Sequence, residues 1–157
     1  MGKEMQEGGK RMNIGFISLG CCKNLVDSEN IMGLLVSAGC KIVNDPKKAD
    51  VLMVNTCGFI EPAKEEAINK LVDLMDATGR LRDKEAYKKA VLERESLSTT
   101  GIGDNIAIPH AKTSAVKEAG LSAMVLTNGV DYDSLDGEPA KLFFMIAAPE
   151  GENNLHL

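Results

Sequence analysis

The side chains with the greatest capacity for nucleophilic or metal chemistry in this chain are two histidines and four cysteines. His110 directly follows Pro109 at the end of an alternating apolar run, NIAIPHAK, and His156 lies near the end of the sequence. Imidazole can serve as a nucleophile, a proton carrier or a metal ligand near neutral pH. A histidine that follows a strand is also commonly a solvated surface residue, so position alone leaves both interpretations of His110 open.

The cysteines stand at positions 21, 22, 40 and 57. None of them forms a CxxC pair, which argues against a zinc knuckle, and their spacing suggests no disulfide framework. Free cysteine is among the most frequently buried residue types, so these thiols can be small apolar core groups without chemistry. Thiolates also bind iron, so an iron–sulfur site is the alternative interpretation.

The composition excludes several classes of protein. Of the 157 residues, 44% are apolar but only 4% are aromatic and none is tryptophan, which predicts an aliphatic core. A formal net charge of −5 argues against a nonspecific nucleic-acid binder, which would carry a basic face. The longest apolar runs, such as LFFMIAA (142–148), are too short to span a bilayer, and IGFISL is a poor signal-peptide core. We therefore expect a cytoplasmic protein without direct membrane insertion.

Strands and helices alternate in the first half of the sequence. Apolar runs and helical spacing predict strands over 13–20, 40–43 and 51–57 and helices over 23–39 and 62–78. This order is typical of the front of a doubly wound α/β unit with a parallel sheet. Cys21 and Cys57 would then lie where a parallel strand ends, at the sheet edge where such folds present ligands.

The pattern changes in the second half. Asp83 is a good N-cap for a helix over 84–96, with Ala86 and Val91 facing inward. The segment STTGIGDN (98–105) predicts a glycine-rich loop. Further strands are expected over 106–109, 121–127 and 141–147. The predicted fold class is three-layer α/β, in which a parallel, Rossmann-like βαββα first half continues into an α/β second half with a mixed sheet.

The first half also resembles a known family. GFISLGCCKNLVDSENIMGLL, followed by ADVLMVNTCGFIEPAKEEAI, is similar to the N-terminal domain of the radical-SAM methylthiotransferases, nearest the branch that modifies a ribosomal protein. The resemblance covers residues 12–68. In that family three cysteines of this domain hold an auxiliary [4Fe–4S] cluster, and the resemblance assigns two of these positions to Cys21 and Cys57.

The chain departs from this family in ways that bear on function. The third cluster cysteine would come beyond the next helix and strand, where this sequence reads EAYKKAVLERES and has no cysteine. Cys22 and Cys40 are the other thiols that could substitute, although adjacent thiols rarely point at one metal. The CxxxCxxC motif of the radical-SAM core is absent from the sequence. Methylthiotransferase activity is therefore not expected, and a [4Fe–4S] site would have an incomplete ligand set.

The second half resembles an unrelated family. LRDKEAYKKAVLERESLSTTGIGDNIAIPHAK, together with FFMIAAPEGENNLHL, is similar to the type-2 enzyme IIA of the bacterial sugar phosphotransferase system, fructose branch. The resemblance implies that His110 accepts a phosphoryl group from the phosphocarrier HPr and passes it to enzyme IIB, with no cofactor required. Imidazole suits this chemistry because it is nucleophilic and uncharged near neutral pH and then becomes a good leaving group.

The same resemblance implies further site residues. Arg94 would offer a planar fork of donors to the phosphoryl oxygens. His156 would lie near His110, where it would hydrogen-bond the phosphoryl group or adjust the pKa of the acceptor. A phosphoryl-binding loop at Gly101 and Gly103 would let the main chain approach closely and supply N–H groups. Phosphoryl transfer depends on such positioning and electrostatic stabilisation more than on covalent chemistry.

The two resemblances meet at AKEEAINKLVDLM. They divide the chain into a disordered tail (1–11), a partial methylthiotransferase-like domain (12–64) and a partial enzyme IIA-like domain (65–157). The sequence thus looks like a chimera, in which the strand at 51–57 and the helix at 62–78 could replace a strand and helix that the enzyme IIA part lacks. The preferred function is a phosphohistidine carrier, with an iron–sulfur module and a non-functional chimera as alternatives.

Overall fold

The computed structural model describes residues 11–19, 22–56 and 64–151, so most of the tail predicted over 1–11 lies outside it. The elements are β1 (Asn13–Leu19), α1 (Cys22–Ser37), β2 (Lys41–Val43), a short 3-10 helix η1 (Pro46–Lys48), β3 (Val51–Thr56), α2 (Lys64–Ala77), α3 (Lys84–Leu97), β4 (Gly101–Gly103), β5 (Ile106–Ala107), β6 (His110–Thr113), β7 (Gly120–Val130) and β8 (Ala140–Pro149). The predicted α/β class is confirmed. None of the described helices is long and apolar enough to cross a bilayer.

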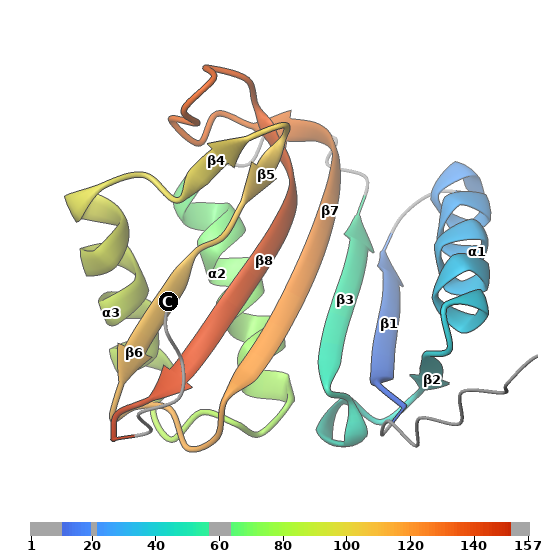
Figure 1. Cartoon of the computed structure of the whole chain (residues 1–157), viewed down its shortest axis with the longest axis horizontal. Coiled ribbons are helices and arrows are strands. Elements are labelled where there is room, and N and C mark those ends of the chain that lie inside the picture. Colours follow the sequence, from blue (N-terminus) through green and yellow to red (C-terminus); the bar gives the residue numbers. More distant parts are fainter. Residues whose placement is uncertain (1–10, 20–21, 57–63, 152–157) are drawn as a thin grey trace, which may run out of the picture.

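All the described strands belong to one sheet (Figure 1). Their order is β2-β1-β3-β7-β8-β5-β4, and β6 also pairs with β8. β1, β2 and β3 are parallel, as predicted, and β7 continues this parallel arrangement beside β3. β8 runs antiparallel to β7, while β5 and β6 run parallel to β8. The second half of the chain therefore contributes the mixed part of the sheet.

The pairing of β3 with β7 joins the two halves of the chain. It runs from Val51 opposite Leu121 to Thr56 opposite Leu126, so the whole of β3 takes part. α2 follows β3 and packs on β7, where the Ser122 hydroxyl donates a hydrogen bond to the carbonyl oxygen of Leu71 at 3.2 Å. β3 and α2 thus supply the neighbouring strand and the covering helix for the second half of the sheet.

Helices cover both faces of the sheet. α2 and α3 lie on one face, above a core of apolar side chains from these helices and from β7 and β8: Leu71, Met75, Tyr87, Val91, Met124, Phe143 and Met145. α1 lies on the opposite face, where Leu35 packs with Ile14 and Ala123. Side chains alternate along β8, since Phe143 belongs to the α2 side and Phe144 to the α1 side. This is the predicted three-layer arrangement.

The inward face of α3 differs from the prediction at Ala86, which is exposed. Tyr87 is buried instead, and its hydroxyl donates to the carbonyl oxygen of Ile146 at 3.0 Å. Val91 is buried as predicted, and Asp83 caps the helix by accepting a hydrogen bond from the Ala86 amide at 2.9 Å. The aromatic ring takes the inward position because its burial removes far more apolar area from water than burial of a methyl group.

The loop predicted over 98–105 contains a strand, which corrects the prediction. β4 pairs antiparallel with β5 through a tight turn at Asp104 and Asn105, whose φ angles are 53° and 61°. Positive φ at both central positions is the type I′ hairpin geometry, which Asp and Asn tolerate well. The expected strand at 106–109 is also interrupted, because Pro109 has no N–H to donate to a sheet, and β6 begins after it.

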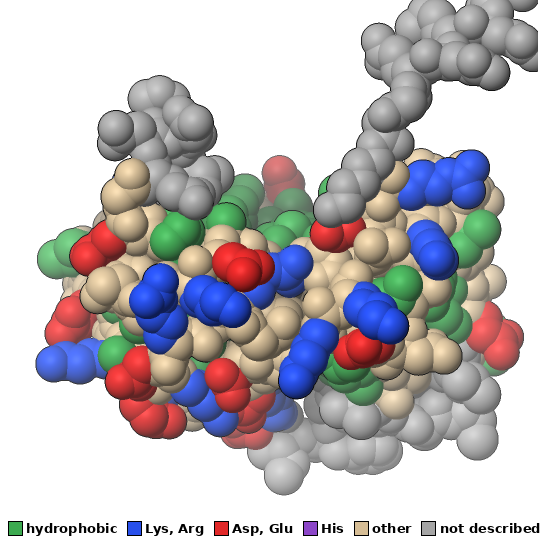
Figure 2. Space-filling view, turned by 90° about the horizontal axis from the view of Figure 1, so that it is seen from below, with side chains coloured by type: hydrophobic (Ala, Val, Ile, Leu, Met, Phe, Trp, Pro, Cys, Tyr) green, Lys and Arg blue, Asp and Glu red, His purple; other side chains and the backbone are tan. Residues whose placement is uncertain are grey.

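Basic and acidic side chains are mixed over the face seen in Figure 2. Several charged residues of α2 and α3 pair with each other, as Lys84 does with Asp73 at 2.7 Å and Lys70 with Glu66 at 3.0 Å. Exposed pairs of this kind contribute little to stability. On the face shown, the described residues present no extended basic surface of the kind that binds nucleic acid.

Candidate functional site

His110 is the first residue of β6, the short strand beside β8. The carbonyl oxygen of Pro109 accepts a hydrogen bond from the Ile146 amide at 3.0 Å, which fixes the main chain just before the histidine. The imidazole is half-buried and lines an open groove between α3 and β6. The groove is lined by Ala90, Glu93, Arg94, Ser96, Leu97, His110, Ala111 and Lys112.

The hydrogen bonds of the imidazole define its tautomer. Nδ1 of His110 lies 2.8 Å from the carbonyl oxygen of Ile108. A carbonyl oxygen can only accept, so Nδ1 carries the proton. Nε2 lies 3.2 Å from Nε of Arg94, which can only donate, so Nε2 presents its lone pair. The neutral ring therefore keeps a nucleophilic nitrogen on the side that faces Arg94.

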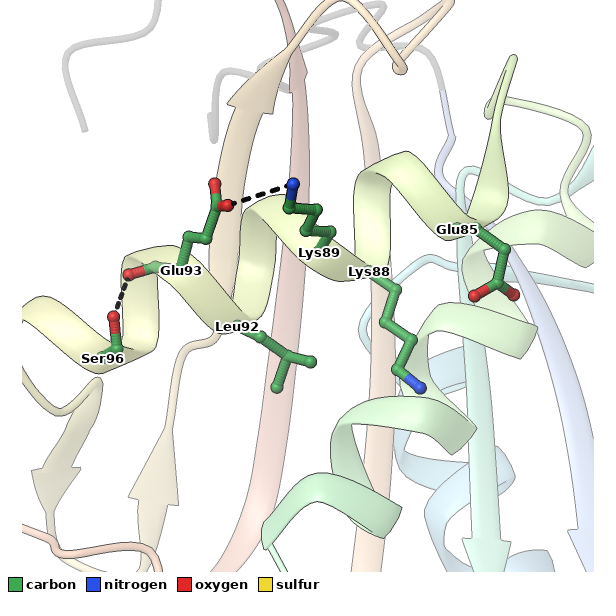
Figure 3. Close-up of a pocket in the computed structure, with 6 residues that line it drawn as sticks. All are labelled: Glu85, Lys88, Lys89, Leu92, Glu93 and Ser96. Atoms are coloured by element: carbon green, nitrogen blue, oxygen red, sulfur yellow. Dashed lines mark hydrogen bonds and ion pairs between the residues drawn. The ribbon is translucent and has the colours of Figure 1, made fainter.

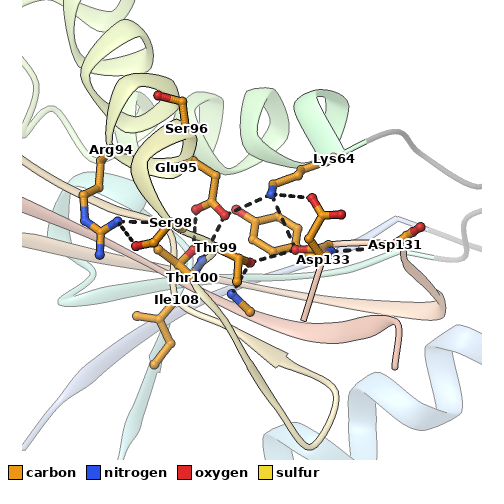
Figure 4. A network of polar contacts seen from close by, with 12 residues as sticks. Lys64, Arg94, Glu95, Ser96, Ser98, Thr99, Thr100, Ile108, Asp131 and Asp133 are labelled. Carbon is orange, nitrogen blue, oxygen red and sulfur yellow. Dashed lines mark hydrogen bonds and ion pairs between the residues drawn. The ribbon is translucent and has the colours of Figure 1, made fainter. Parts of the chain in front are cut away.

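Arg94 reaches His110 from the last turn of α3. Its Nη1 atom donates to the carbonyl oxygen of Ser98 at 3.2 Å and to the Ser98 hydroxyl at 3.1 Å (Figure 4). Ser98 and His110 thus hold two edges of one planar guanidinium. The Nη2 atom has no hydrogen-bond partner among the described residues. Its N–H groups can therefore bind an anion that sits beside Nε2 of His110.

A second groove lies on the outer face of α3 (Figure 3). It is lined by Glu85, Lys88, Lys89, Leu92, Glu93 and Ser96. Its charged groups pair with neighbouring charges, Lys89 with Glu93 at 3.7 Å and Lys88 with Glu65 at 3.8 Å. Charges along one helix face are usually a solvated surface, and the lining contains no nucleophile oriented by a base or a donor. We therefore place the candidate site in the groove at His110.

The structure brings together two of the predicted site residues, His110 and Arg94. Gly101 and Gly103 lie in β4 and pack against the segment between β7 and β8. A Cβ on Gly101 would lie 2.7 Å from the hydroxyl oxygen of Ser134, and the Gly101 amide already donates to a threonine hydroxyl at 3.1 Å. Close packing against Ser134 explains glycine at position 101. The phosphoryl-binding role expected of the two glycines stays a prediction.

His156, Cys21 and Cys57 lie outside the described residues, so their predicted roles stay predictions. The position of Cys40 argues against it as a third cluster ligand. Cys40 comes just before β2, whose first residue is level with the first residue of β1, whereas Cys21 follows the end of β1 in the sequence. A strand of this length spans roughly 20 Å at about 3.3 Å per residue, so Cys40 lies near the end of the sheet opposite to the last residue of β1. Cys40 packs instead with the apolar side chains on the α1 side of the sheet.

Two groups at the site were not anticipated from the sequence. Ser98 lies four residues after Arg94, and this spacing on a helical pattern is a signal that could have indicated the contact. Ile108 takes part through its carbonyl oxygen alone. Every residue carries a main-chain carbonyl group, so residue types could not have predicted this contact.

The fold agrees with solved enzyme IIA structures. It matches the crystal structure of IIA mannitol from Escherichia coli with a TM-score of 0.50 and 32% identity, over 57% of this chain and 64% of that chain. It matches the complex of enzyme IIAMTL and phosphorylated enzyme IIBMTL from Escherichia coli with a TM-score of 0.51 and 30% identity, over 57% of this chain and 63% of that chain. The fold of the matched part of the chain is thus that of a IIA domain.

Family models match both halves. Residues 57–157 match the phosphoenolpyruvate-dependent sugar phosphotransferase system, EIIA 2, and residues 13–91 match the uncharacterized protein family UPF0004. Each match covers at least half of the chain. The chain belongs to the EIIA 2 family of the sugar phosphotransferase system through its second half and to UPF0004 through its first half. Both resemblances found in the sequence are confirmed, and the matches overlap over 57–91.

Curated relatives of two kinds match parts of the chain. The chain is 55% identical over 94 residues to the PTS system fructose-specific EIIABC component of Bacillus subtilis, and 46% identical over 94 residues to the PTS system fructose-specific EIIA component of Haloferax volcanii. Each match covers 60% of this chain, but 15% and 61% of the relatives. The chain is also 52% identical over 68 residues to the ribosomal protein uS12 methylthiotransferase RimO of Symbiobacterium thermophilum. This match covers 43% of this chain and 14% of that protein.

Proposed function

We propose that the chain is a phosphohistidine carrier of the sugar phosphotransferase system, fructose branch, which accepts a phosphoryl group on Nε2 of His110. The single observation that carries this proposal is the contact between Nε2 and Arg94, in a ring whose Nδ1 is already bonded to a main-chain carbonyl. Membership of the EIIA 2 family supports it. HPr is the proposed donor and enzyme IIB the proposed acceptor, in line with the complex of a IIA and a phosphorylated IIB among the matching structures.

The transfer step uses the lone pair that the tautomer leaves on Nε2. Nε2 attacks the phosphorus of phosphorylated HPr, and a new N–P bond forms as the N–P bond to the donor imidazole breaks. The electron pair of the broken bond returns to the donor nitrogen. The proton on Nδ1 of His110 stays in its hydrogen bond to the Ile108 carbonyl, which stabilises the positive charge that the ring gains. The second transfer, to enzyme IIB, reverses these roles.

Arg94 stabilises the transferring phosphoryl group in this proposal. Charge spreads over the equatorial oxygens in a loose transition state, so donors placed around that equator lower the barrier. The free Nη2 atom of Arg94 is one such donor beside Nε2 of His110. His156 is proposed as a second donor on the strength of the sequence resemblance. Neither residue needs a metal or cofactor for this role.

The proposal is tested by incubating the chain with phosphoenolpyruvate, enzyme I and HPr. We expect a phosphate that is stable to base and labile to acid, which is the behaviour of a phosphohistidine. Omission of HPr should prevent the labelling, because the donor to this site is HPr. If the folded wild-type chain remains unlabelled at catalytic and at stoichiometric amounts of HPr, the proposal is wrong and the non-functional chimera is preferred.

Replacement of Arg94 is expected to slow phosphorylation without preventing it. Loss of one preorganised donor to a transition-state oxyanion costs about a hundredfold in rate, so Arg94→Ala should lower the labelling rate by about that factor. Arg94→Lys keeps the charge but loses the planar fork, so it should recover little of the rate. Arg82→Ala is the matched control, since Arg82 is exposed and lies outside the groove. A labelling rate unchanged in Arg94→Ala would remove Arg94 from the site.

One observation favours a second function, iron–sulfur binding. β1 and β3 are adjacent and parallel, and their last paired residues are Leu19 and Thr56. In the sequence Cys21 comes two residues after Leu19 and Cys57 comes one residue after Thr56, and open parallel sheets present ligands at the edge where their strands end. Among the described residues there is no group of three potential ligands that could hold a metal ion.

Iron analysis decides this second function. The resemblance assigns only Cys21 and Cys57 as ligands, so the ligand set is short of the cysteine thiolates that iron–sulfur clusters use. After anaerobic reconstitution with iron and sulfide, we therefore expect fewer than about one iron per chain and no visible absorbance. A stoichiometric cluster that is lost in Cys57→Ser would contradict this expectation and would identify ligands outside the described residues.

A further inference from the structure

Glu95 is a buried carboxylate that the proposed phosphoryl transfer does not use. Only 7% of the residue is exposed, although it stands next to Arg94 in the last turns of α3. Its Oε1 atom accepts from the Thr100 amide at 2.9 Å and its Oε2 atom accepts from the Thr100 hydroxyl at 2.5 Å (Figure 4). Burial of a charge costs free energy unless the charge is paired and hydrogen-bonded, so these contacts compensate for the burial of the Glu95 carboxylate.

The positive partner of Glu95 is Lys64, at the start of α2. Its Nζ atom lies 3.1 Å from Oε1 of Glu95 and 3.2 Å from Oδ2 of Asp133, and 4.6 Å above the centre of the Tyr132 ring. The pKa of Tyr132 is raised above its usual value, first by burial and then by the charge of Glu95, so the ring stays neutral. One ammonium group therefore links α2, α3 and the segment that follows β7.

A series of hydrogen bonds connects Glu95 to the two groups of the proposed site, His110 and Arg94. The carbonyl oxygen of Thr100 accepts from the Ile108 amide at 2.9 Å, and the carbonyl oxygen of Ile108 accepts from Nδ1 of His110 at 2.8 Å. Nε2 of His110 accepts from Arg94, the neighbour of Glu95 in the helix. Glu95, Thr100, Ile108, His110 and Arg94 thus close a ring of contacts. A shift of Thr100 would move the carbonyl that sets the tautomer of the histidine.

We propose that Glu95 is a positioning residue for phosphoryl transfer, which holds Thr100 so that His110 and Arg94 meet in the reactive geometry. The inference rests on the proposed function of His110. Glu95 does not touch the phosphoryl group. Glu95 holds the segment 94–100 through its hydrogen bond with the Thr100 amide. The hydrogen bond from Arg94 to Ser98 holds the same segment at a second point. Transfer rates are sensitive to small displacements of reacting groups, so loss of this support lowers the rate.

The test compares Glu95→Gln in two backgrounds, wild type and Arg94→Ala, by single-turnover transfer from phosphorylated HPr. Glutamine keeps the size of the side chain but removes the charge that pairs with Lys64. In the wild-type background we expect the maximal rate to fall by about tenfold with an unchanged half-saturating HPr concentration. In the Arg94→Ala background we expect a smaller loss, because one of the two groups that Glu95 positions is already gone. Glu85→Gln, an exposed glutamate at the start of α3, is the matched control.

A purely structural role predicts a different pattern. It would lower the rate by the same factor in both backgrounds, or lower the stability in urea without changing the rate, and either result overturns the proposal. Thr100→Ala is the second variant if Glu95→Gln fails to fold, since it removes one hydrogen bond and keeps the Lys64 ion pair. It should lower the maximal rate in the same direction, and a wild-type rate in folded Thr100→Ala also overturns the proposal.

A spectroscopic measurement separates this inference from the proposed function. The ¹⁵N shifts of the His110 ring report the tautomer and the contact of Nε2 in the unphosphorylated chain. We expect Glu95→Gln to move both signals toward those of a ring that exchanges between tautomers, and Glu85→Gln to leave them in place. Unchanged signals overturn the positioning role even if the wild type is phosphorylated. A wild-type chain that is not phosphorylated overturns the proposed function of His110. The ¹⁵N shifts of His110 in Glu95→Gln still show, in that case, whether Glu95 positions the ring.

Discussion

His110→Ala is expected to abolish phosphorylation of the chain by the HPr system. The groove holds one imidazole among the described residues, and its Nε2 lone pair is the nucleophile in the proposed transfer. Alanine leaves Arg94 in place but provides no atom to which the phosphorus can bond, so neither a higher HPr concentration nor a longer incubation should restore label. Acid-labile phosphate counted on the purified chain is the measurement.

The second histidine provides the comparison for this result. His156→Ala should slow labelling but leave it detectable, as the sequence resemblance implies for a residue that assists His110. Urea titrations of both variants should show a folded protein in the absence of urea. For His110→Ala we expect this because His110 is half-buried and contributes little apolar area to the core. Label that persists in His110→Ala and disappears in His156→Ala would show that the acceptor had been assigned to the wrong histidine.

Leu52→Ala in β3 is expected to destabilise the second half of the chain as well as the first. Leu52 is 1% exposed, and loss of a buried leucine side chain costs about 2 to 5 kcal/mol in the free energy of unfolding. β3 is hydrogen-bonded to β7 along its whole length, with Leu52 opposite Ser122. The loss should therefore reach the enzyme IIA part through the shared sheet.

The natural tyrosines make this expectation measurable. The chain has no tryptophan, and its two tyrosines, Tyr87 and Tyr132, are both buried in the second half. Tyrosine fluorescence in urea thus reports unfolding of that half, and its midpoint should fall in Leu52→Ala. Leu34→Ala is the matched control in the first half, since Leu34 is 72% exposed. A tyrosine transition that is unchanged in Leu52→Ala would mean that the two halves unfold independently.

Local patterns predicted the elements well where burial followed a clear period. The apolar runs over β1, β3 and β8 and the N-cap of α3 could be predicted because side-chain spacing and capping act within a few residues. The predictions were wrong where contacts between distant segments decided between two structures that the local sequence allows. Ala86 and Tyr87 are neighbours on α3, and contact with Ile146 on β8 placed the ring inward. β4 exists because a turn at Asp104 and Asn105 returns the chain onto β5.

The sequence by itself determined which two families the chain joins, and it marked His110 and Arg94 as candidate site residues. The resemblance of local motifs to enzyme IIA carries that information, because motifs can be compared without coordinates, whereas the position of His110 by itself left its role open. Only the tertiary structure decided that β3 pairs with β7, that Nε2 faces Arg94, and that Glu95 is buried against Lys64. These outcomes depend on main-chain carbonyls, strand register and burial, which are set by contacts between segments far apart in the chain.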